Sequence, residues 1–376
     1  MYEGITNHYE PGMKRPKLCC DSHIVLEPND EWNYAHHPYI MFFKGKYYVT
    51  FSNGPCHEDD VGQVMRYVTS SDFVNWSKPR LLAGPYRGEH REGVILPGGL
   101  YTDGETLTAY YAAHEWDESA LKDGHRTNGN KGRKNFANFC ITTRDGETWS
   151  DPIPLACAGG NVNPQKLQSG RLLWAGGRTS AYTDQTDGVS GWTETVCFPA
   201  GYPQAKEFDN GEGLDADTPV GLVSDTLVGL CEGSFVQTED GTIYMLLRSG
   251  TPVLWACESH DNAQTWTLPS PTRFSDNRTK FNLGRLPSGR YYYVGTPDPF
   301  PPRTRHVLAL SVSDDGLEYT RHFLLADAQY KGQYPGIDKN GIYGYPSTII
   351  CDGFLCVAFS ICKEKIMVLR VPCDTL

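Results

Sequence analysis

What the 376-residue sequence lacks excludes several classes of protein. It has no uninterrupted apolar run of about 18 residues, the length that a membrane-spanning helix needs. Its 12 cysteines form no CxxC pair, so neither a zinc site nor a thioredoxin-type motif is indicated. The formal net charge of −11 is the wrong sign for a nucleic-acid partner. A few arginines in one pocket could still bind an acidic small molecule.

Recognisable catalytic motifs and long helices are also missing. There is no phosphate-binding loop, nucleophile elbow, metalloprotease motif or EF-hand loop, so we expect no metal and no cofactor. No long stretch has the apolar period of an amphipathic helix. The N-terminus shows no basic segment followed by an apolar run. We therefore expect a cytoplasmic protein with reduced thiols, or a secreted one if a leader was removed.

The sequence is instead rich in residues that form short strands and tight turns. It contains 39 Gly, 25 Pro and 22 Tyr, and 12% of its residues are aromatic. A short strand, a polar turn and a second, aromatic strand recur six times, which indicates β-hairpins. The strand pairs are 40–43 with 47–51, 93–96 with 108–112, 165–167 with 172–174, 234–236 with 242–247, 282–286 with 290–294, and 347–350 with 354–359.

Repetition at intervals of roughly 40 to 70 residues predicts an all-β propeller of six modules, with residues 1–376 forming one domain. The last module has only three obvious strands, so residues 17–27 should pair with it and close the ring. The stretch 181–230 is loosely patterned and leaves room for a seventh blade. The polar segment 117–135 is an insertion that either overhangs one face or forms a surface loop.

Hairpin geometry predicts where functional residues lie. The start of the first strand and the end of the second fall at the same end of a blade, so these positions should surround one mouth of the propeller. The polar residues at these positions are His36, His37, Asn53, His57, Arg91, His114, Glu115, Asn163, Arg178, Glu232, Arg248, Asn282, Asp298 and Tyr345. Loop ends are usually polar, but histidine, arginine and carboxylates together favour a functional site.

Histidines and arginines are the main candidates within this ring. His37 and His57 suit acid/base work because imidazole exchanges protons near neutral pH, although each could be structural. Pro38 should hold His37 in an extended conformation. The arginine candidates could bind a carboxylate through two hydrogen bonds or form salt bridges between blades. They are Arg91, Arg178, Arg248 and Arg285.

Several turns resemble the Asp-boxes of sialidases. These turns lie at 71–76, 144–149, 259–266 and 313–319, and most combine Asp or Asn with a following Trp. Sialidases also have an early Arg-Ile-Pro type motif, an arginine triad and a Tyr/Glu nucleophile. The similar early stretch here is Lys14-Arg15-Pro16-Lys17, which departs from that motif.

Residues 33–80 resemble a narrower family of propeller enzymes. His36-His37-Pro38, the hairpin ending at 51–54, His57-Glu-Asp and the turn 71–76 are similar to enzymes that remove terminal L-rhamnose from α-1,4-linked D-glucuronate in arabinogalactan-type glycans. The resemblance implies seven blades, His37 as acid/base with His57 as its partner, and arginines that neutralise the uronate. Arg178 and Arg285 match best, and the further substrate-binding candidates are His36, Asn53, Arg91, Asn163, Glu232, Arg248 and Tyr345.

Three functions remain open from the sequence. A lyase would use histidine to remove the C5 proton and arginine to neutralise the adjacent carboxylate. A glycoside hydrolase, either a rhamnosidase or a divergent sialidase, would need carboxylates, and no spacing singles out a pair among Glu115, Glu232 and Asp298. A non-catalytic glycan-binding propeller is the third. The expected ligand in the first case is a uronate-containing glycan.

Overall fold

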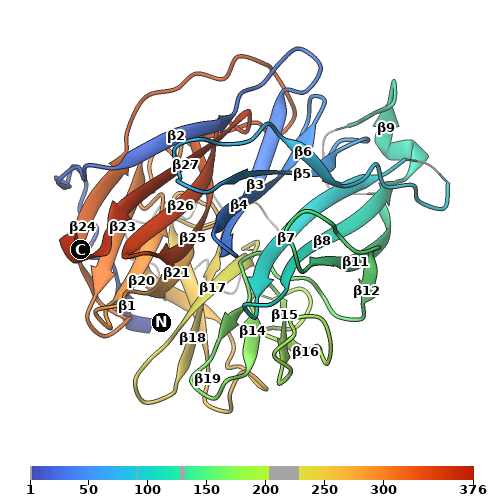
Figure 1. The fold of residues 1–376 in the computed structure, drawn as a ribbon. Coiled ribbons are helices and arrows are strands. Elements are labelled where there is room, and N and C mark those ends of the chain that lie inside the picture. Colours follow the sequence, from blue (N-terminus) through green and yellow to red (C-terminus); the bar gives the residue numbers. More distant parts are fainter. Residues whose placement is uncertain (1, 91, 128–131, 203–227) are drawn as a thin grey trace.

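The computed structural model describes residues 2–90, 92–127, 132–202 and 228–376. Within these residues, six sheets are arranged around a central axis as the blades of a propeller (Figure 1). The predicted all-β fold with six modules is therefore confirmed. The seven blades implied by the family resemblance are not found in this part of the chain, and Arg91 lies outside it.

Each blade is built from strands that follow one another outward from the axis, and every predicted hairpin forms its two inner strands. Blade 1 contains β3 (Tyr34–Phe43), β4 (Lys46–Gly54), β5 (Val64–Ser70) and β6 (Arg80–Ala83); blade 2 contains β7 (Val94–Thr102), β8 (Leu107–Trp116), β11 (Arg133–Thr143) and β12 (Ile153–Leu155); blade 3 contains β13 (Gln165–Lys166), β14 (Leu172–Trp174), β15 (Thr179–Thr183) and β16 (Thr193–Val196). Blade 4 contains β17 (Cys231–Gln237), β18 (Ile243–Arg248), β19 (Val253–Ser259) and β20 (Ser270–Ser275); blade 5 contains β21 (Asn282–Arg285), β22 (Tyr291–Gly295), β23 (Leu308–Ser313) and β24 (Tyr319–Ala326); blade 6 contains β25 (Tyr343–Cys351), β26 (Phe354–Ile361) and β27 (Lys365–Pro372).

The N-terminal segment adds outer strands to two blades. β2 (Asp21–Leu26) pairs antiparallel with β27, so a segment from early in the chain and the last strand share blade 6 (Figure 1). β1 (Tyr2–Thr6) pairs parallel with β20 as a fifth strand of blade 4. The insertion after β8 contains η1 (Glu118–Ala120) and the hairpin of β9 (Leu121–Lys122) and β10 (His125–Arg126), and η4 (Cys373–Thr375) follows β27. None of the helices described has the length and apolar character to cross a membrane.

Aspartate-containing turns close the outer hairpins of five blades. In blade 1, Asp72 accepts hydrogen bonds from the backbone N–H groups of Val74 at 2.9 Å and Asn75 at 2.7 Å. The same arrangement recurs at Asp145, Asp187 and Asp315. Asp261 accepts from the N–H groups of Gln264 and Thr265, each one position further along. Asp187 lies within the stretch 181–230, whose first part therefore belongs to blade 3.

The core lies between neighbouring blades rather than inside one of them. Ile40 and Val49 of blade 1 pack with Cys356 and Val368 of blade 6. This arrangement explains the aromatic content, because large side chains fill the wedge-shaped gaps between twisted sheets.

Four of the innermost strands contain a β-bulge close to the axis. β3 has one more residue than β4 between the pairs His36–Ser52 and Tyr39–Thr50, and β7, β17 and β25 have the same irregularity. A bulge breaks the ladder and re-aims a side chain.

The bulge residues on three of these strands have left-handed backbones. The φ angles are 51° at His37, 43° at Glu232 and 55° at Tyr345. The expectation that Pro38 keeps His37 extended is therefore wrong. Proline instead fits the bulge because it has no N–H to leave unpaired, and Pro346 follows Tyr345 in the same way.

Candidate functional site

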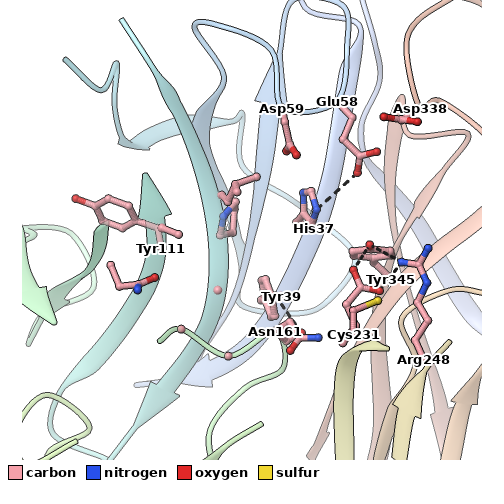
Figure 2. Close-up of a pocket in the computed structure, with 18 of the residues that line it drawn as sticks. His37, Tyr39, Glu58, Asp59, Tyr111, Asn161, Cys231, Arg248, Asp338 and Tyr345 are labelled. Carbon is pink, nitrogen blue, oxygen red and sulfur yellow. Dashed lines mark hydrogen bonds and ion pairs between the residues drawn. The ribbon is translucent and has the colours of Figure 1, made fainter. Parts of the chain in front are cut away.

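The bulges open into a cavity of about 750 Å³ (Figure 2). Its lining comes from strands of blades 1, 2, 3, 4 and 6 and from the loops that follow β4 or precede blades 3 and 6. The loop between β22 and β23 and the turn between β26 and β27 complete it. Left-handed non-glycine residues are uncommon and gather at functional sites, where surrounding structure maintains them. This concentration at one cavity marks it as the candidate active site. Eight of its lining residues have such backbones: His37, Asp59, Glu232, Arg303, Arg305, Asp338, Tyr345 and Lys363.

A tyrosine, a glutamate and an arginine from three strands meet on one wall of this cavity. Arg248 Nη1 donates to Glu232 Oε2 at 2.5 Å and to the Tyr345 hydroxyl at 3.0 Å, and the Tyr345 hydroxyl donates to Glu232 Oε1. Burial, with the Glu232 carboxylate second, raises the pKa of Tyr345 well above its usual value. Burial opposes ionisation of Glu232, but Arg248 still holds the pKa of that carboxyl below its usual value. Tyr345 is therefore neutral at rest, with an ionised base in contact.

Arg305 adds a cation that forms no ion pair with a carboxylate within the described part of the chain. It precedes β23, its side chain lines the cavity, and the residue is 3% exposed. Arg305 Nη2 donates to the carbonyl of Arg278 at 2.9 Å, whereas Nε has no hydrogen-bond partner among the described residues. Burial, then Arg248, lowers its pKa. A buried guanidinium without a counter-ion is costly, so the site is arranged for an anion.

The loop after β4 brings two carboxylates to the other side of the cavity. Glu58 Oε2 accepts from Lys363 Nζ at 2.5 Å, and Asp59 Oδ2 accepts from Arg133. Burial and the neighbouring Glu58 raise the pKa of Asp59 to about 6. Burial disfavours the charge on Glu58, but Lys363 and His37 hold its pKa below the usual value. Two adjacent carboxyls with pKa values shifted in opposite directions are typical of acid/base sites.

His37 lies between these two sets of residues (Figure 2). Its ring centroid is 5.1 Å from that of Tyr345, and its Nε2 is 3.8 Å from Glu58 Oε1. Burial lowers the pKa of His37 to about 4, so the imidazole is neutral at physiological pH.

The remaining wall of the cavity is neutral. It consists of backbone and uncharged side chains from blade 2, from the segment that precedes blade 3 and from β14: Leu96, Pro97, Gly98, Tyr111, Ala112, Phe136, Asn138, Ala158, Gly159, Gly160, Asn161 and Trp174. Tyr39 spans the gap, and its hydroxyl donates to the carbonyl of Asn161 at 3.1 Å. This wall offers aromatic faces and amides, the groups that suit an uncharged part of a ligand.

The structure brings some of the predicted site residues together here. His37, Glu232, Arg248 and Tyr345 line the cavity, and each lies in a strand at the predicted end of its blade. His36 is fully buried behind them, with its ring centroid 4.1 Å from that of Tyr345.

Other predicted residues lie elsewhere. His57 does not line the cavity, and its Nδ1 accepts a hydrogen bond from the backbone N–H of Ile337 at 3.2 Å. Asn53 and Asn163 are buried and bind backbone carbonyls. Asn53 Nδ2 donates to the carbonyl of Tyr34, and Asn163 Nδ2 donates to the carbonyl of Ile40.

Arg178 and Arg285 are exposed and do not line the cavity. Arg285 is the last residue of β21, at the hairpin-turn end of the strand, and it pairs with Glu239.

Four important residues were missed by sequence reasoning: Glu58, Asp59, Arg305 and Lys363. Glu58 and Asp59 directly follow His57, and they were used only as part of the His57-Glu-Asp motif in the family resemblance. Arg305 and Lys363 lie in loops, outside the strand-end positions that hairpin geometry selects. An acidic pair next to a candidate histidine was the available signal for the first two.

Solved structures with this fold include several sialidases. The chain superposes on a sialidase with a TM-score of 0.59 at 19% identity, covering 99% of this chain but 34% of that one. The NanB sialidase from Streptococcus pneumoniae superposes with a TM-score of 0.62 at 12% identity, covering 94% of this chain and 71% of that one. The Trypanosoma rangeli sialidase superposes with a TM-score of 0.60 at 12% identity, covering 94% of this chain and 60% of that one. At these identities the similarity shows the fold, which is that of a sialidase-like propeller.

A family model described as a BNR repeat-like domain matches residues 48–357. That range is most of the chain, so the protein belongs to the BNR repeat-like domain family. No curated protein matches the sequence.

Proposed function

We propose that this protein is a retaining glycoside hydrolase that removes a terminal, carboxylate-bearing sugar from a glycan. The observation that carries the proposal is the contact of the Tyr345 hydroxyl with both Glu232 and Arg248. Sialidases use a tyrosine nucleophile in place of the usual carboxylate, and their fold is the one found here. A tyrosine nucleophile would replace one member of the carboxylate pair that ordinary glycosidases use.

The charges of the cavity support an anionic substrate. Three of its cations have acidic partners: Arg248 with Glu232, Lys363 with Glu58, and Arg133 with Asp59. Arg305 has no such partner in the described part of the chain, and Arg303 lines the cavity close by. A sugar carboxylate next to Arg305 would neutralise this buried charge.

The proposed chemistry assigns three groups. Glu232 takes the phenolic proton as the Tyr345 oxygen bonds to the anomeric carbon, and Asp59 protonates the leaving oxygen as the glycosidic bond breaks. In the second step Asp59 takes a proton from water, the water oxygen replaces Tyr345 at the anomeric carbon, and Glu232 returns the proton to the phenolate. Figure 2 shows Asp59 and Tyr345 approaching the cavity from different sides, as an acid and a nucleophile must.

The test is hydrolysis of aryl glycosides of sialic acid and of glucuronic acid, with the first-formed anomer identified by NMR. We expect retention of configuration and a glycosyl adduct on the peptide that contains Tyr345. An inverted product, or full activity in Tyr345→Phe, would rule out this mechanism.

A second candidate is a lyase that releases L-rhamnose from α-1,4-linked D-glucuronate. It is favoured by one observation: His37 is a neutral imidazole in the cavity, able to accept the C5 proton while Arg305 neutralises the carboxylate. The products differ, because elimination leaves an unsaturated uronate with strong ultraviolet absorbance and hydrolysis leaves none. A rhamnosyl-glucuronate disaccharide assayed for both free rhamnose and absorbance separates the two candidates.

A further inference from the structure

Two histidines and a glutamate converge beside the Tyr345 group. Nε2 of His36 and Nε2 of His37 lie 3.9 and 3.8 Å from Glu58 Oε1. The three atoms all lie within 4.8 Å of one another. These separations are too long for hydrogen bonds, so the three groups do not satisfy one another.

The hydrogen bonds of Ser52 determine which nitrogen of His37 carries the proton. Ser52 Oγ donates its single proton to the carbonyl of His36 at 2.9 Å. It can therefore only accept from His37 Nδ1, which lies 3.0 Å away. His37 thus has its proton on Nδ1, and in the neutral ring Nε2 presents a lone pair toward Glu58.

The same arrangement recurs behind His36. Ser360 Oγ donates to the carbonyl of Gly344 at 3.2 Å and accepts from His36 Nδ1 at 2.6 Å. His36 is fully buried, and its Nε2 has no hydrogen-bond partner among the described residues. A buried acceptor without a donor is costly, so this lone pair needs an explanation.

The carboxylate is oriented in the same manner. Lys363 Nζ donates to Glu58 Oε2 at 2.5 Å, which leaves Oε1 facing the two imidazoles. Three potential ligand atoms thus lie within 4.8 Å of one another, and each ligand group is held by a hydrogen bond at its other polar atom. Metal ligands in proteins are oriented in this way, with the second ring N–H of histidine donating to an oxygen and the carboxylate hydrogen-bonded.

We propose that His36, His37 and Glu58 bind one divalent transition-metal ion of the zinc class. Two imidazole nitrogens and one carboxylate oxygen are the protein ligands of open catalytic zinc sites and are too few in oxygen for Ca²⁺ or Mg²⁺. His37 and Glu58 line the cavity, so the remaining coordination positions face it. A sugar hydroxyl or carboxylate oxygen would complete the coordination.

The spacing of the ligands is close to what such an ion requires. Edges of 3.8 and 3.9 Å correspond to metal–ligand distances of about 2.3 to 2.4 Å in a tetrahedron, against about 2.0 to 2.2 Å for zinc with nitrogen or oxygen. A rotamer adjustment of Glu58 can shorten these two edges by a few tenths of an ångström. The third edge, between the two Nε2 atoms, is below 4.8 Å and closes through a small movement of the imidazoles.

This inference does not depend on the proposed hydrolase activity, because binding is measured without substrate. It does bear on the lyase candidate. A metal on Nε2 of His37 occupies the lone pair that the lyase needs for proton abstraction. Metal binding at this site therefore excludes His37 as the base in the metal-loaded protein.

The test is titration of the metal-stripped full chain with Co²⁺, whose visible bands report its ligands, followed by displacement with Zn²⁺. We expect one equivalent bound by nitrogen and oxygen, with two hyperfine-shifted exchangeable N–H signals from the imidazoles. His37→Ala and Glu58→Gln should weaken binding by more than the roughly 10–100-fold that outer-shell changes cost, and Ser52→Ala should fall within that range. Zn²⁺ should raise the Tm of wild type and of Tyr345→Phe but not of Glu58→Gln.

A matched control uses the other place among the described residues where three such groups converge: His57, Asp60 and His125. We expect His125→Ala to keep the Co²⁺ site intact. Loss of the signal in His125→Ala but not in Glu58→Gln would overturn the assignment, as would a thiolate charge-transfer band from one of the 12 cysteines. Failure of wild type to bind one equivalent would overturn it as well, while leaving the hydrolase proposal standing.

Discussion

The charged wall and the neutral wall of the cavity both contain β-bulges, but the bulges present different kinds of residue. On blades 1, 4 and 6 the bulge presents His37, Glu232 or Tyr345, each with a left-handed backbone. On blade 2 the bulge lies between Pro97 and Gly99 and presents glycine. The bulge therefore creates the opening in every case, and the side chain decides whether that wall carries charge or leaves space.

The difference has an energetic side. A non-glycine residue in the left-handed region costs of order 1–3 kcal/mol. The charged wall contains several such residues, three of them at bulges, whereas the bulge of blade 2 has glycine. Strained residues that contact one another are typical of an active site rather than of a purely structural region. The neutral wall should then govern packing and the fit of the ligand.

The largest expected effect on activity comes from removing one tyrosine hydroxyl from the charged wall, compared with the same change on the neutral wall. Tyr345→Phe should lower kcat by about a thousandfold or more, because it removes the nucleophile, and should leave the fold intact. Tyr111→Phe, on the neutral wall, should change kcat less than about threefold. Steady-state kinetics on an aryl glycoside of an acidic sugar measures both. Equal losses in the two variants would remove the distinction between the walls.

Arg305→Met should move activity and stability in opposite directions. Losing the unpaired guanidinium should lower kcat/KM for carboxylate substrates by roughly 10–100-fold, the value of a charge-assisted contact. It should also raise Tm, because a buried charge without a counter-ion is replaced by an apolar chain of similar length. Kinetics and thermal unfolding on the same preparation check both signs. A fall in Tm with unchanged kcat/KM would mean that Arg305 is structural.

The same comparison explains how much the sequence could predict. Turn chemistry is local, so all six hairpins and most Asp-containing turns were found from residue type alone. His37, Glu232, Arg248 and Tyr345 were found because they lie in strands whose direction the hairpins define.

The bulges were not predicted, because one extra residue in a strand leaves no compositional trace. Pro38 and Pro346 were hints, and Pro38 was taken as evidence for an extended His37 when it marks a break in the ladder. Arg305 and Lys363 come from loops whose path depends on tertiary packing. Arg285 illustrates the converse error. It was expected at the mouth of the propeller, but it is the last residue of β21 and lies beside the hairpin turn.

A smaller effect is expected on the neutral wall. A Cβ on Gly160 would lie 2.2 Å from Trp174 Cδ1 and 2.7 Å from the carbonyl of Ala175, so Gly160→Ala should reduce the free energy of unfolding by about 1–3 kcal/mol. Gly98→Ala is the matched control, because its Cβ would lie 3.2 Å from the same indole and should cost less. Denaturant unfolding ranks the two. A larger cost at Gly98 would show that the wall is not set by contact with Trp174.

The smallest effect at neutral pH concerns a histidine of blade 2. His114 is fully buried, neither ring nitrogen has a hydrogen-bond partner among the described residues, and burial, then Arg133, lowers its pKa to about 3. The folded state therefore favours the neutral ring. Its contribution to stability is complete above the unfolded-state pKa of about 6.5 and is lost as pH falls toward 3.

His114→Phe keeps a ring against Phe136 and Trp116 but cannot take up a proton. We expect little change in the free energy of unfolding at pH 7.5. Between pH 6 and 4 the wild type should lose stability relative to the variant by about 1.4 kcal/mol per pH unit, one proton's worth. Parallel curves for the two proteins would show that His114 is not held neutral by the fold. Any loss of unfolding free energy at low pH would then have to come from other groups, such as His36 and His37 on the charged wall.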